Sequence, residues 1–272
     1  MIRLGSSFKI LLCLSLCVGV VSVWSQSTLV VEEQTWDGAS VYVVKADPAQ
    51  YRLVLLLPKD NYVQYMRDFS VDYPQAQAII NAGFYKKDGR PTGFLKADEW
   101  RSTTYKTRGV IGFNQSSPQS VIFDRLTAAN GNLQSMYRGG RWWQDMNNIV
   151  GGAPLLLADG KALSLDPEQM LPTFVTGRHA RSAICRTTSD QLLFVLVQGG
   201  DQYATYIGVS SGLTLFSLRR LLQSLDCRDA LNLDGGYSSS MLVNGQLVVG
   251  HWLQHVASRP IANALAFIPC SH

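Results

Sequence analysis

The chain has 272 residues, 46% of them hydrophobic and 16% charged, with no repeat or low-complexity tract, so it can bury a sizeable core. Its formal net charge of +4 includes Arg3 and Lys9 near the N-terminus, and without them the charge is about +2. No basic tract remains elsewhere, which argues against nucleic acid or a membrane surface as the partner.

The first 25 residues have the pattern of a secretory signal peptide. Arg3 and Lys9 precede an apolar run from Ile10 to Val23, and Ser25 supplies a small residue at the cleavage point. The run is too short to span a bilayer comfortably. We therefore expect an exported protein, periplasmic or secreted, whose domain covers residues 26–272 and has no stable membrane insertion. An uncleaved anchor stays open as an alternative, because Trp24 lies beside the cut.

Three cysteines remain after the signal segment: Cys185, Cys227 and Cys270. In an oxidising compartment they allow at most one bridge within the chain. The sequence does not rank the three possible pairings.

The N-terminal part of the domain begins with two apolar runs typical of adjacent strands, residues 41–44 and 51–57, the second stopped by Pro58. A short amphipathic helix is expected next, capped by Asp60 and ended by Pro74. Its buried face would hold Tyr62, Met66 and Phe69.

A buried strand, residues 78–85, follows and places Asn81 beside Gly83 and two aromatic residues, of which Tyr85 is one. Residues 87–90 form the tip of a hairpin. Asn81 either takes part in a site or satisfies amides at the end of the strand.

The middle of the chain continues as short strands between residues 109 and 123, followed by an irregular segment, residues 136–148, that holds Trp142 and Trp143 among arginines. Such a segment suits a rim that stacks on sugars and meets anions, although paired tryptophans more often lie in a core. A strand over residues 149–157 then contains Gly152.

Two arginines, Arg178 and Arg181, precede the next buried strand. Guanidinium groups fit phosphate through two parallel hydrogen bonds, so the pair is a candidate phosphate clamp, with a solvated charged loop as the alternative. A core strand over residues 192–197 follows. Leucines on one face predict a helix over residues 213–225 with Thr214 as its N-cap, and the strand, helix and next strand read as a crossover unit.

That helix leads into the stretch around which the chain is organised, residues 230–241. An apolar strand carries Asn232 and Asp234 to the glycine pair Gly235 and Gly236, and Ser238 and Ser239 come next. Glycines allow close approach of the backbone, and the following amides and hydroxyls can line an anion-binding concavity. The alternative is a tight hairpin whose Asp bonds its own backbone.

The remaining chain contains a hairpin at Asn244 and Gly245 and a closing strand over residues 261–268. Many short strands, several Asp-Gly or Asn-Gly turns and few helices predict an α+β fold, a single mixed domain.

Four separated segments together resemble the phosphodiester glycosidase family. They are Ile80-Asn-Ala-Gly-Phe-Tyr85, Val150-Gly-Gly-Ala-Pro-Leu-Leu156 with Asp159-Gly-Lys161, Ala180-Arg-Ser-Ala-Ile184, and Ala230-Leu-Asn-Leu-Asp-Gly-Gly236 with Ser238 and Ser239. The resemblance spans about residues 40–268. It implies an exported hydrolase that cuts a sugar-1-phosphodiester on envelope or extracellular glycans, with a phosphorylated carbohydrate as partner.

The resemblance also implies roles for individual residues, with no cofactor and no metal. The catalytic group would comprise Asp234, Asn81 and Arg181: a carboxylate at the sugar, an amide that orients sugar or carboxylate, and a cation at the phosphate. The substrate-binding group would comprise Arg178, Gly235, Gly236, Ser238, Ser239, Gly152 and Tyr85.

The chain departs from the family pattern at three positions. Gln198 and Gly199 stand where many members have Asp-Gly, with Asp201 the nearest carboxylate, and Cys185 and Tyr237 stand where glycine is usual. The Gln198 change favours a rival function, a non-catalytic envelope module that binds phosphate-bearing glycans.

Two further enzyme classes find little support. A metal-dependent phosphoesterase would need ligand spacing, and His251 and His255 lack an accompanying Glu. A Ser-His-Asp hydrolase would need the G-x-S-x-G elbow, which the stretch after Gly236 does not have.

Overall fold

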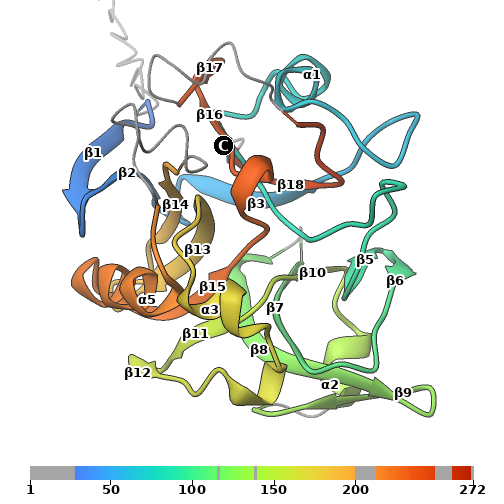
Figure 1. Cartoon of the computed structure of the whole chain (residues 1–272). Helices are drawn as coiled ribbons and strands as arrows, with labels where there is room; N and C mark the ends of the chain where they lie inside the picture. The colour runs from blue at the N-terminus through green and yellow to red at the C-terminus, as the bar shows by residue number, and fades with distance from the viewer. Residues whose placement is uncertain (1–27, 115–116, 138–139, 200–211, 249–258, 271–272) are drawn as a thin grey trace, which may run out of the picture.

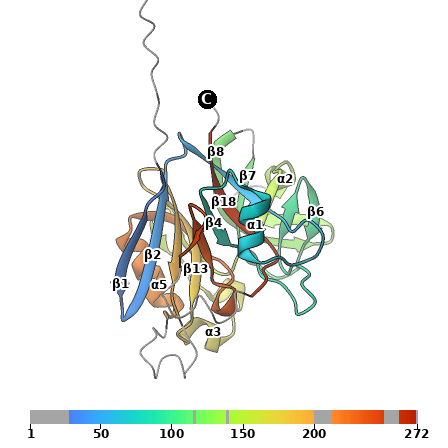
Figure 2. The same ribbon diagram turned by 90° about the horizontal axis from the view of Figure 1, so that it is seen from above.

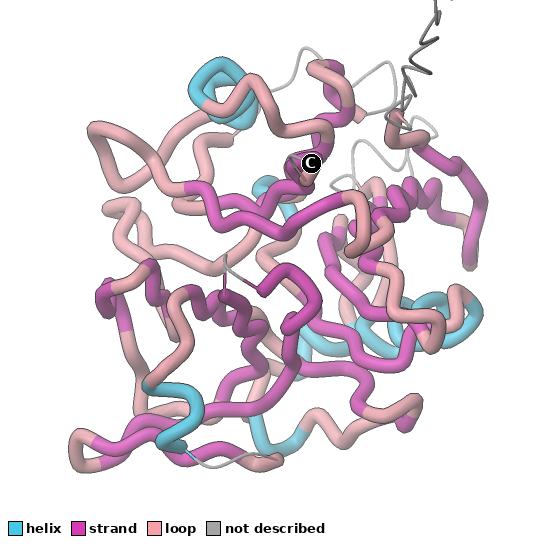
Figure 3. Tube along the Cα trace, turned by 180° about the vertical axis from the view of Figure 1, so that it is seen from behind, coloured by secondary structure: helices cyan, strands magenta, loops and turns pink. Residues whose placement is uncertain are grey.

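The computed structural model describes residues 28–114, 117–137, 140–199, 212–248 and 259–270. The predicted signal peptide, Asp201, His251 and His255 lie outside the described residues. Strands dominate the described part and helices are short (Figure 3). The predicted mixture of many short strands with few helices is therefore confirmed, although a mainly β description fits the proportions better than α+β.

The largest sheet has seven strands among the described residues, and every neighbouring pair is antiparallel. Its strands in spatial order are β1 Val31–Trp36, β2 Ala39–Ala46, β14 Leu192–Val197, β13 Arg181–Thr187, β15 Cys227–Asn232, β11 Leu155–Ala158 and β12 Lys161–Ala162.

Two smaller antiparallel sheets accompany it. The five-stranded sheet has the order β17 Gln246–Leu247, β16 Met241–Val243, β4 Ala78–Asn81, β18 Ala264–Pro269 and β3 Tyr51–Leu56. The six-stranded sheet has the order β6 Glu99–Ser102, β5 Leu95–Ala97, β10 Asn148–Gly151, β7 Arg108–Asn114, β8 Ser117–Ala129 and β9 Asn132–Ser135.

Two predictions about strands were wrong, one about which strands are neighbours and one about the extent of a strand. The runs at 41–44 and 51–57 are not adjacent, because β2 pairs with β1 and β14 whereas β3 pairs with β18 in another sheet. The single strand predicted over residues 149–157 is two strands, β10 and β11, again in different sheets. In both cases the chain leaves one sheet for the next, which an apolar pattern alone does not reveal.

The three sheets share one central core. Side chains from the inner face of each sheet pack together there, among them Phe194 of β14 and Phe267 of β18, whose rings stack with centroids 3.8 Å apart. Three separate apolar clusters lie on the outer faces, and each includes or adjoins a helix: α5 Leu215–Ser224, α1 Met66–Asp72 and α2 Gly140–Gln144. Figures 1 and 2 show these helices at the periphery.

The predicted helix beginning after Thr214 is confirmed as α5. The Thr214 hydroxyl accepts a hydrogen bond from the Ser217 amide, which caps the first turn, and Leu215, Leu218, Leu221 and Leu222 are buried. The crossover is confirmed too, because β14 and β15 both run antiparallel to β13, which lies between them, and so are parallel to each other.

The other helices depart from the sequence prediction. α1 begins after Tyr65 and buries Met66 and Phe69, but Tyr62 lies outside it and is 61% exposed, so Asp60 does not cap it. The short segments Asp166–Glu168 (η1), Pro172–Thr176 (α3) and Gly236–Ser238 (η2) connect strands.

One of the two tryptophans predicted in the irregular segment, residues 136–148, lies in the core. Trp143 of α2 is fully buried against Gly112, and its indole N–H donates to the Asp124 carboxylate at 3.0 Å. Arg138 lies outside the described residues. The core interpretation therefore holds for Trp143, and a sugar-stacking role for that ring is excluded.

A buried ion pair joins the seven-stranded and six-stranded sheets. Glu168 of η1 accepts hydrogen bonds from Arg125 Nε (2.9 Å), the Leu155 amide (2.8 Å) and the Gly109 amide (2.8 Å). Arg125 also donates to the carbonyls of Leu155 and Ser164. Burial raises the pKa of Glu168, while these donors and the arginine charge oppose the rise. One carboxylate thus fixes strands β7, β8 and β11 to each other.

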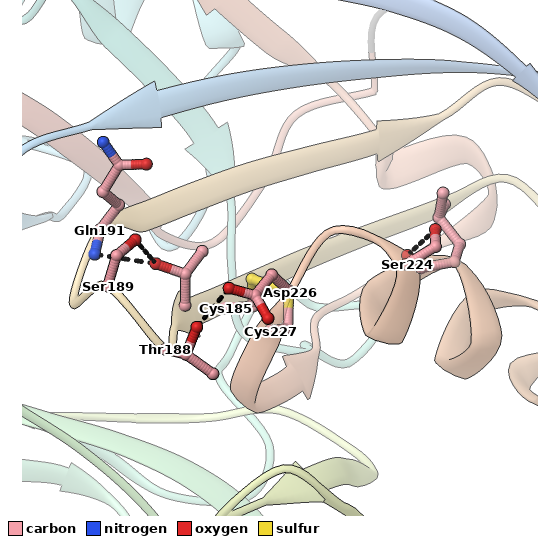
Figure 4. Close-up of a disulfide and its surroundings, with 9 residues drawn as sticks. Cys185, Thr188, Ser189, Gln191, Ser224, Asp226 and Cys227 are labelled. Atoms are coloured by element: carbon pink, nitrogen blue, oxygen red, sulfur yellow. Dashed lines mark hydrogen bonds between the residues drawn. A yellow bond between two sulfur atoms is a disulfide. The ribbon is translucent and has the colours of Figure 1, made fainter.

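The structure selects one of the three cysteine pairings. Cys185 of β13 and Cys227 of β15 form a disulfide with Cα atoms 5.8 Å apart, and Cys270 is free (Figure 4). Beside the bridge, the Thr188 hydroxyl donates to the Asp226 carboxylate. The bridge closes a loop of 42 residues that contains α5.

We expect loss of this bridge to lower the free energy of unfolding by about 2–4 kcal/mol, because the unfolded chain regains the entropy of an open loop. Urea unfolding of the Cys185→Ala/Cys227→Ala variant measures the effect. Cys270→Ala is the control and should unfold like the wild type. Equal stability of all three proteins would show that the bridge contributes nothing.

Candidate active site

The candidate site lies where the three sheets meet. Asn81 ends β4, Gly151 ends β10, and Asn232 ends β15. The Ala153 amide donates to the Asn232 carbonyl at 2.9 Å, and the Asp234 amide donates to the Ala82 carbonyl at 2.8 Å. The four motif segments found in the sequence are therefore brought together, since the Leu233 amide also bonds the Ser182 carbonyl.

Asn81 is buried and holds the segments in register. Its side-chain oxygen accepts from the Ser182 hydroxyl (2.6 Å) and the Ser240 amide (3.0 Å), and its Nδ2 donates to the Asp234 carbonyl (2.7 Å). With 1% of its surface exposed, it acts on the backbone of Asp234. The Asn81 amide therefore satisfies groups at the end of the strand, as one of the two predicted alternatives has it, and by the same bonds it fixes the backbone of Asp234.

Asp234 is the carboxylate of the site. Burial raises its pKa to about 6, against the lowering effects of the Ser238 hydroxyl, the Gly235 amide and the positive charge of Arg259. The Gly235 amide donates to Asp234 Oδ1 at 2.9 Å. A carboxyl that titrates near pH 6 is suited to proton transfer or to charge stabilisation at neutral pH.

The glycines around Asp234 act either by allowing close packing or by adopting a positive φ. The Gly236 amide donates to the Ala180 carbonyl, and the Gly235 amide bonds Asp234, so neither predicted anion donor is unoccupied. Gly236 has a φ of +61°, which a residue with a side chain rarely adopts. Gly152 is buried, and a Cβ there would lie 2.3 Å from the Asn232 carbonyl. Gly152 thus lets the chain approach the end of β15, whereas Gly236 allows the turn after Asp234 through its positive φ.

Arg181 is a fully buried cation in one of the four motif segments. It donates to the carbonyls of Leu213, Phe174 and Gly177, and its guanidinium carbon lies 4.8 Å from the centroid of the Phe174 ring. Nη1 has no hydrogen-bond partner among the described residues. Burial lowers the pKa of Arg181 to about 10, so the group remains charged at neutral pH.

Arg178 has different partners. Its guanidinium donates to the carboxylate (3.2 Å) and the carbonyl of Asp37, in the turn between β1 and β2. Arg178 and Arg181 thus bond separate parts of the protein, and the structure does not join them in the predicted clamp. Gln198, at the end of β14, accepts from the Tyr42 hydroxyl at 3.5 Å.

Tyr85 and the serines border Asp234. The Tyr85 hydroxyl donates to the Pro260 carbonyl at 2.6 Å and lies 3.5 Å from Ser238 Oγ. Ser238 is buried and bonds the Asp234 carboxyl. Ser239 Oγ is buried without a hydrogen-bond partner among the described residues.

Unpartnered buried polar atoms concentrate in these segments. Besides Arg52 Nε, the described part of the chain has four: Arg181 Nη1, Asn232 Oδ1, Ser239 Oγ and Asn263 Nδ2. Each of the four belongs to a segment that contributes to the site. Because buried polar groups in folded proteins nearly always have partners, their concentration here indicates a position for a bound polar ligand or water.

The sequence interpretation missed two residues. Arg259 acts on the charge of Asp234, and the buried Asn263 accepts from the Gly83 amide at 2.7 Å. Both lie in Arg259-Pro-Ile-Ala-Asn263, a polar and apolar mixture just before the last strand. Only the position of Asn263 immediately before a buried strand could have pointed to it.

The described residues contain no group of three His, Cys, Asp or Glu side chains placed to hold a metal ion. Within those same ranges, no helix combines the length and the apolar character needed to cross a membrane.

Comparison with known families gives one match. The sequence model of the phosphodiester glycosidases matches residues 74–268. This range includes all four motif segments, from Ile80 to Ser239. Among curated proteins, none matches this chain.

Several solved structures have a similar fold. A hypothetical protein from Synechocystis has a TM-score of 0.68 at 19% identity over 88% of this chain, which spans 62% of that protein. The catalytic domain of zebrafish N-acetylglucosamine-1-phosphodiester alpha-N-acetylglucosaminidase, auto-inhibited by its pro-peptide, has a TM-score of 0.63 at 14% identity, covering 88% of this chain and 82% of that domain. A Burkholderia pseudomallei protein has a TM-score of 0.63 at 16% identity, covering 85% and 74%.

Proposed function

Since the chain belongs to the phosphodiester glycosidase family, we propose that it is a hydrolase that cuts a sugar-1-phosphodiester at the sugar and releases a phosphomonoester. The observation that carries the proposal is Asp234, a carboxyl with a pKa of about 6 held at the meeting point of three sheets. The zebrafish enzyme's substrate class, an N-acetylglucosamine-1-phosphodiester, is the first to test.

The proposed reaction breaks the bond between the anomeric carbon and the phosphate oxygen. The phosphate takes the bonding electron pair, and because its second pKa is about 6 it can leave with little protonation. Ionised Asp234 stabilises the positive charge that develops at the anomeric carbon, or takes a proton from the attacking water. The water oxygen ends on the sugar.

Other residues support this carboxylate. Asn81 is a positioning residue, because it bonds the Asp234 backbone and is itself buried. Ser238 and the Gly235 amide orient the carboxyl. Arg181 supplies positive charge next to the phosphate position, with Nη1 available to bind an oxygen. Ser239 and Tyr85 are proposed as contacts to substrate oxygens.

Export belongs to the same proposal. The signal-like segment at residues 1–25 and the Cys185–Cys227 disulfide both suit an oxidising compartment, the periplasm or the exterior, where envelope or extracellular glycans are the substrates. The mature domain is taken to cover residues 26–272.

The direct test is incubation of residues 26–272 with a panel of sugar-1-phosphodiesters, with reducing sugar and phosphomonoester measured separately. We expect equal amounts of the two products from at least one member. Saturable glycan binding without product release would instead support the non-catalytic envelope module that the Gln198 position suggested.

The pH dependence follows from the pKa of Asp234. The carboxyl must be ionised in the proposed role, and its pKa is raised to about 6, so kcat/KM should fall about tenfold per pH unit below that value. A profile from pH 4 to pH 9 with the best substrate measures this. Activity that rises as the pH drops through 6 would show that the protonated form is the active one.

A further inference from the structure

An exposed tyrosine lies at the edge of the site. Tyr237 is three residues after Asp234, in the turn η2, and 72% of its surface is exposed. The guanidinium carbon of Arg259, an exposed residue, lies 5.9 Å from the centroid of its ring. The ring therefore presents an aromatic face to solvent in the turn that follows Asp234.

Hydrogen bonds fix the two residues against the site. The Tyr85 hydroxyl donates to the carbonyl of Pro260, the residue after Arg259, and also lies 3.5 Å from the hydroxyl of Ser238, the residue after Tyr237. The Ile261 amide donates to the Gln64 carbonyl, which holds the other side of the segment. The segments that carry Tyr237 and Arg259 are thus both held by Tyr85, which borders Asp234.

The positive charge of Arg259 and the carboxylate of Asp234 lie near each other without forming an ion pair. The Arg259 guanidinium lowers the pKa of Asp234, so it lies within electrostatic reach of the carboxyl. Among the described residues, however, the two form no ion pair within 4 Å. The Arg259 guanidinium therefore keeps its positive charge near Asp234 without forming a salt bridge to it.

We infer that Arg259 binds the phosphate of the diester and that Tyr237 stacks on the ring of the aglycone beyond it. The inference rests on the proposed function, because it takes the sugar's anomeric carbon to lie at Asp234. The phosphate then lies between carboxylate and guanidinium, and the group attached to its far side meets the exposed tyrosine. Guanidinium groups bind phosphate through two hydrogen bonds, and aromatic faces pack on sugar rings.

This assignment gives the chain a substrate preference. The preferred substrates are diesters in which the phosphate joins two ring-bearing groups, with a second sugar favoured over a small alkyl group.

The arginine is tested by calorimetry with inorganic phosphate as the probe, on residues 26–272. Arg259→Gln should weaken phosphate binding about 10- to 100-fold, and Arg259→Lys should weaken it less because the charge remains. The control is Arg219→Gln on α5, since Arg219 also lies over an aromatic ring, that of Phe216 at 5.4 Å, and donates to the Leu163 carbonyl. Phosphate binding unchanged in Arg259→Gln, or absent in the wild type, would overturn the assignment.

The tyrosine is tested with two diesters of one sugar-1-phosphate, one carrying a methyl group and the other a second sugar. Tyr237→Gly should weaken binding of the two-sugar diester about 5-fold and leave the methyl diester unchanged, while Tyr237→Phe should bind both like the wild type. An equal effect on both diesters, or none, would overturn the stacking role. Binding is measured independently of turnover, so tight, Tyr237-dependent binding without hydrolysis would refute the proposed reaction and leave this inference supported.

Discussion

Replacement of Asp234 by asparagine is expected to lower kcat by about 10³-fold or more with the fold unchanged. Asparagine has nearly the same shape and keeps an oxygen that can accept the Gly235 amide, so the turn after β15 should persist. It removes the charge that the reaction requires at the anomeric carbon. Steady-state kinetics on the best diester of the panel measures the loss, and thermal unfolding checks the fold.

The matched control is Asp229→Asn. Asp229 lies in β15, the strand that precedes Asp234, and it bonds Arg228 at 3.0 Å and the Asp159 amide, away from Asn81. Its variant should keep wild-type kcat. If Asp234→Asn turned over like this control, the carboxylate would have no part in catalysis, and the site would have to be sought elsewhere.

Replacement of Glu168 by alanine is expected to lower the free energy of unfolding by about 3–5 kcal/mol, the largest stability effect that we predict. The change leaves Arg125 charged and buried without its carboxylate, and it removes the acceptor of two buried amides from different sheets. Both effects are costly because the freed groups cannot reach water.

Urea unfolding measures this loss, with Glu32→Ala as the control. Glu32 also forms an ion pair, with Lys45 at 2.9 Å, but both side chains are largely exposed, so its removal should cost less than about 1 kcal/mol. A loss of similar size in the two variants would mean that Glu168 is no more than another surface-like ion pair.

The parts of the fold that the sequence predicted correctly are those determined by neighbouring residues. The helix after Thr214 follows from its leucine spacing and its cap. Asn81 ends β4 and Asp234 lies just after β15, where glycines interrupt the apolar runs. The turn at Asn244 and Gly245 also depends on local backbone preference, and both residues have positive φ.

Partners distant in sequence could not be predicted in this way. The strands at 41–44 and 51–57 have the same apolar character, yet they belong to different sheets because the core side chains that they meet come from β14 and β18. The disulfide shows the same limit, since nothing in the sequence distinguishes Cys227 from Cys270 as the partner of Cys185.

The sequence predicted which segments form the candidate site, but it did not predict the partners of the arginines. Short motifs in the right order indicated which segments meet, and they do meet around Asn81 and Asp234. The partners of the arginines depend on the folded structure, which a motif does not show. Arg181 bonds backbone carbonyls and Arg178 bonds Asp37. Arg259, which no motif indicated, acts on the charge of Asp234.

The most direct test of the proposed reaction is hydrolysis of the best diester in water enriched in ¹⁸O, followed by mass spectrometry of both products. If the bond at the anomeric carbon breaks, the label appears in the free sugar and the phosphomonoester carries none. Label in the phosphate would show that the phosphorus–oxygen bond is cut, and it would contradict both the glycosidase reaction and the role proposed for Asp234.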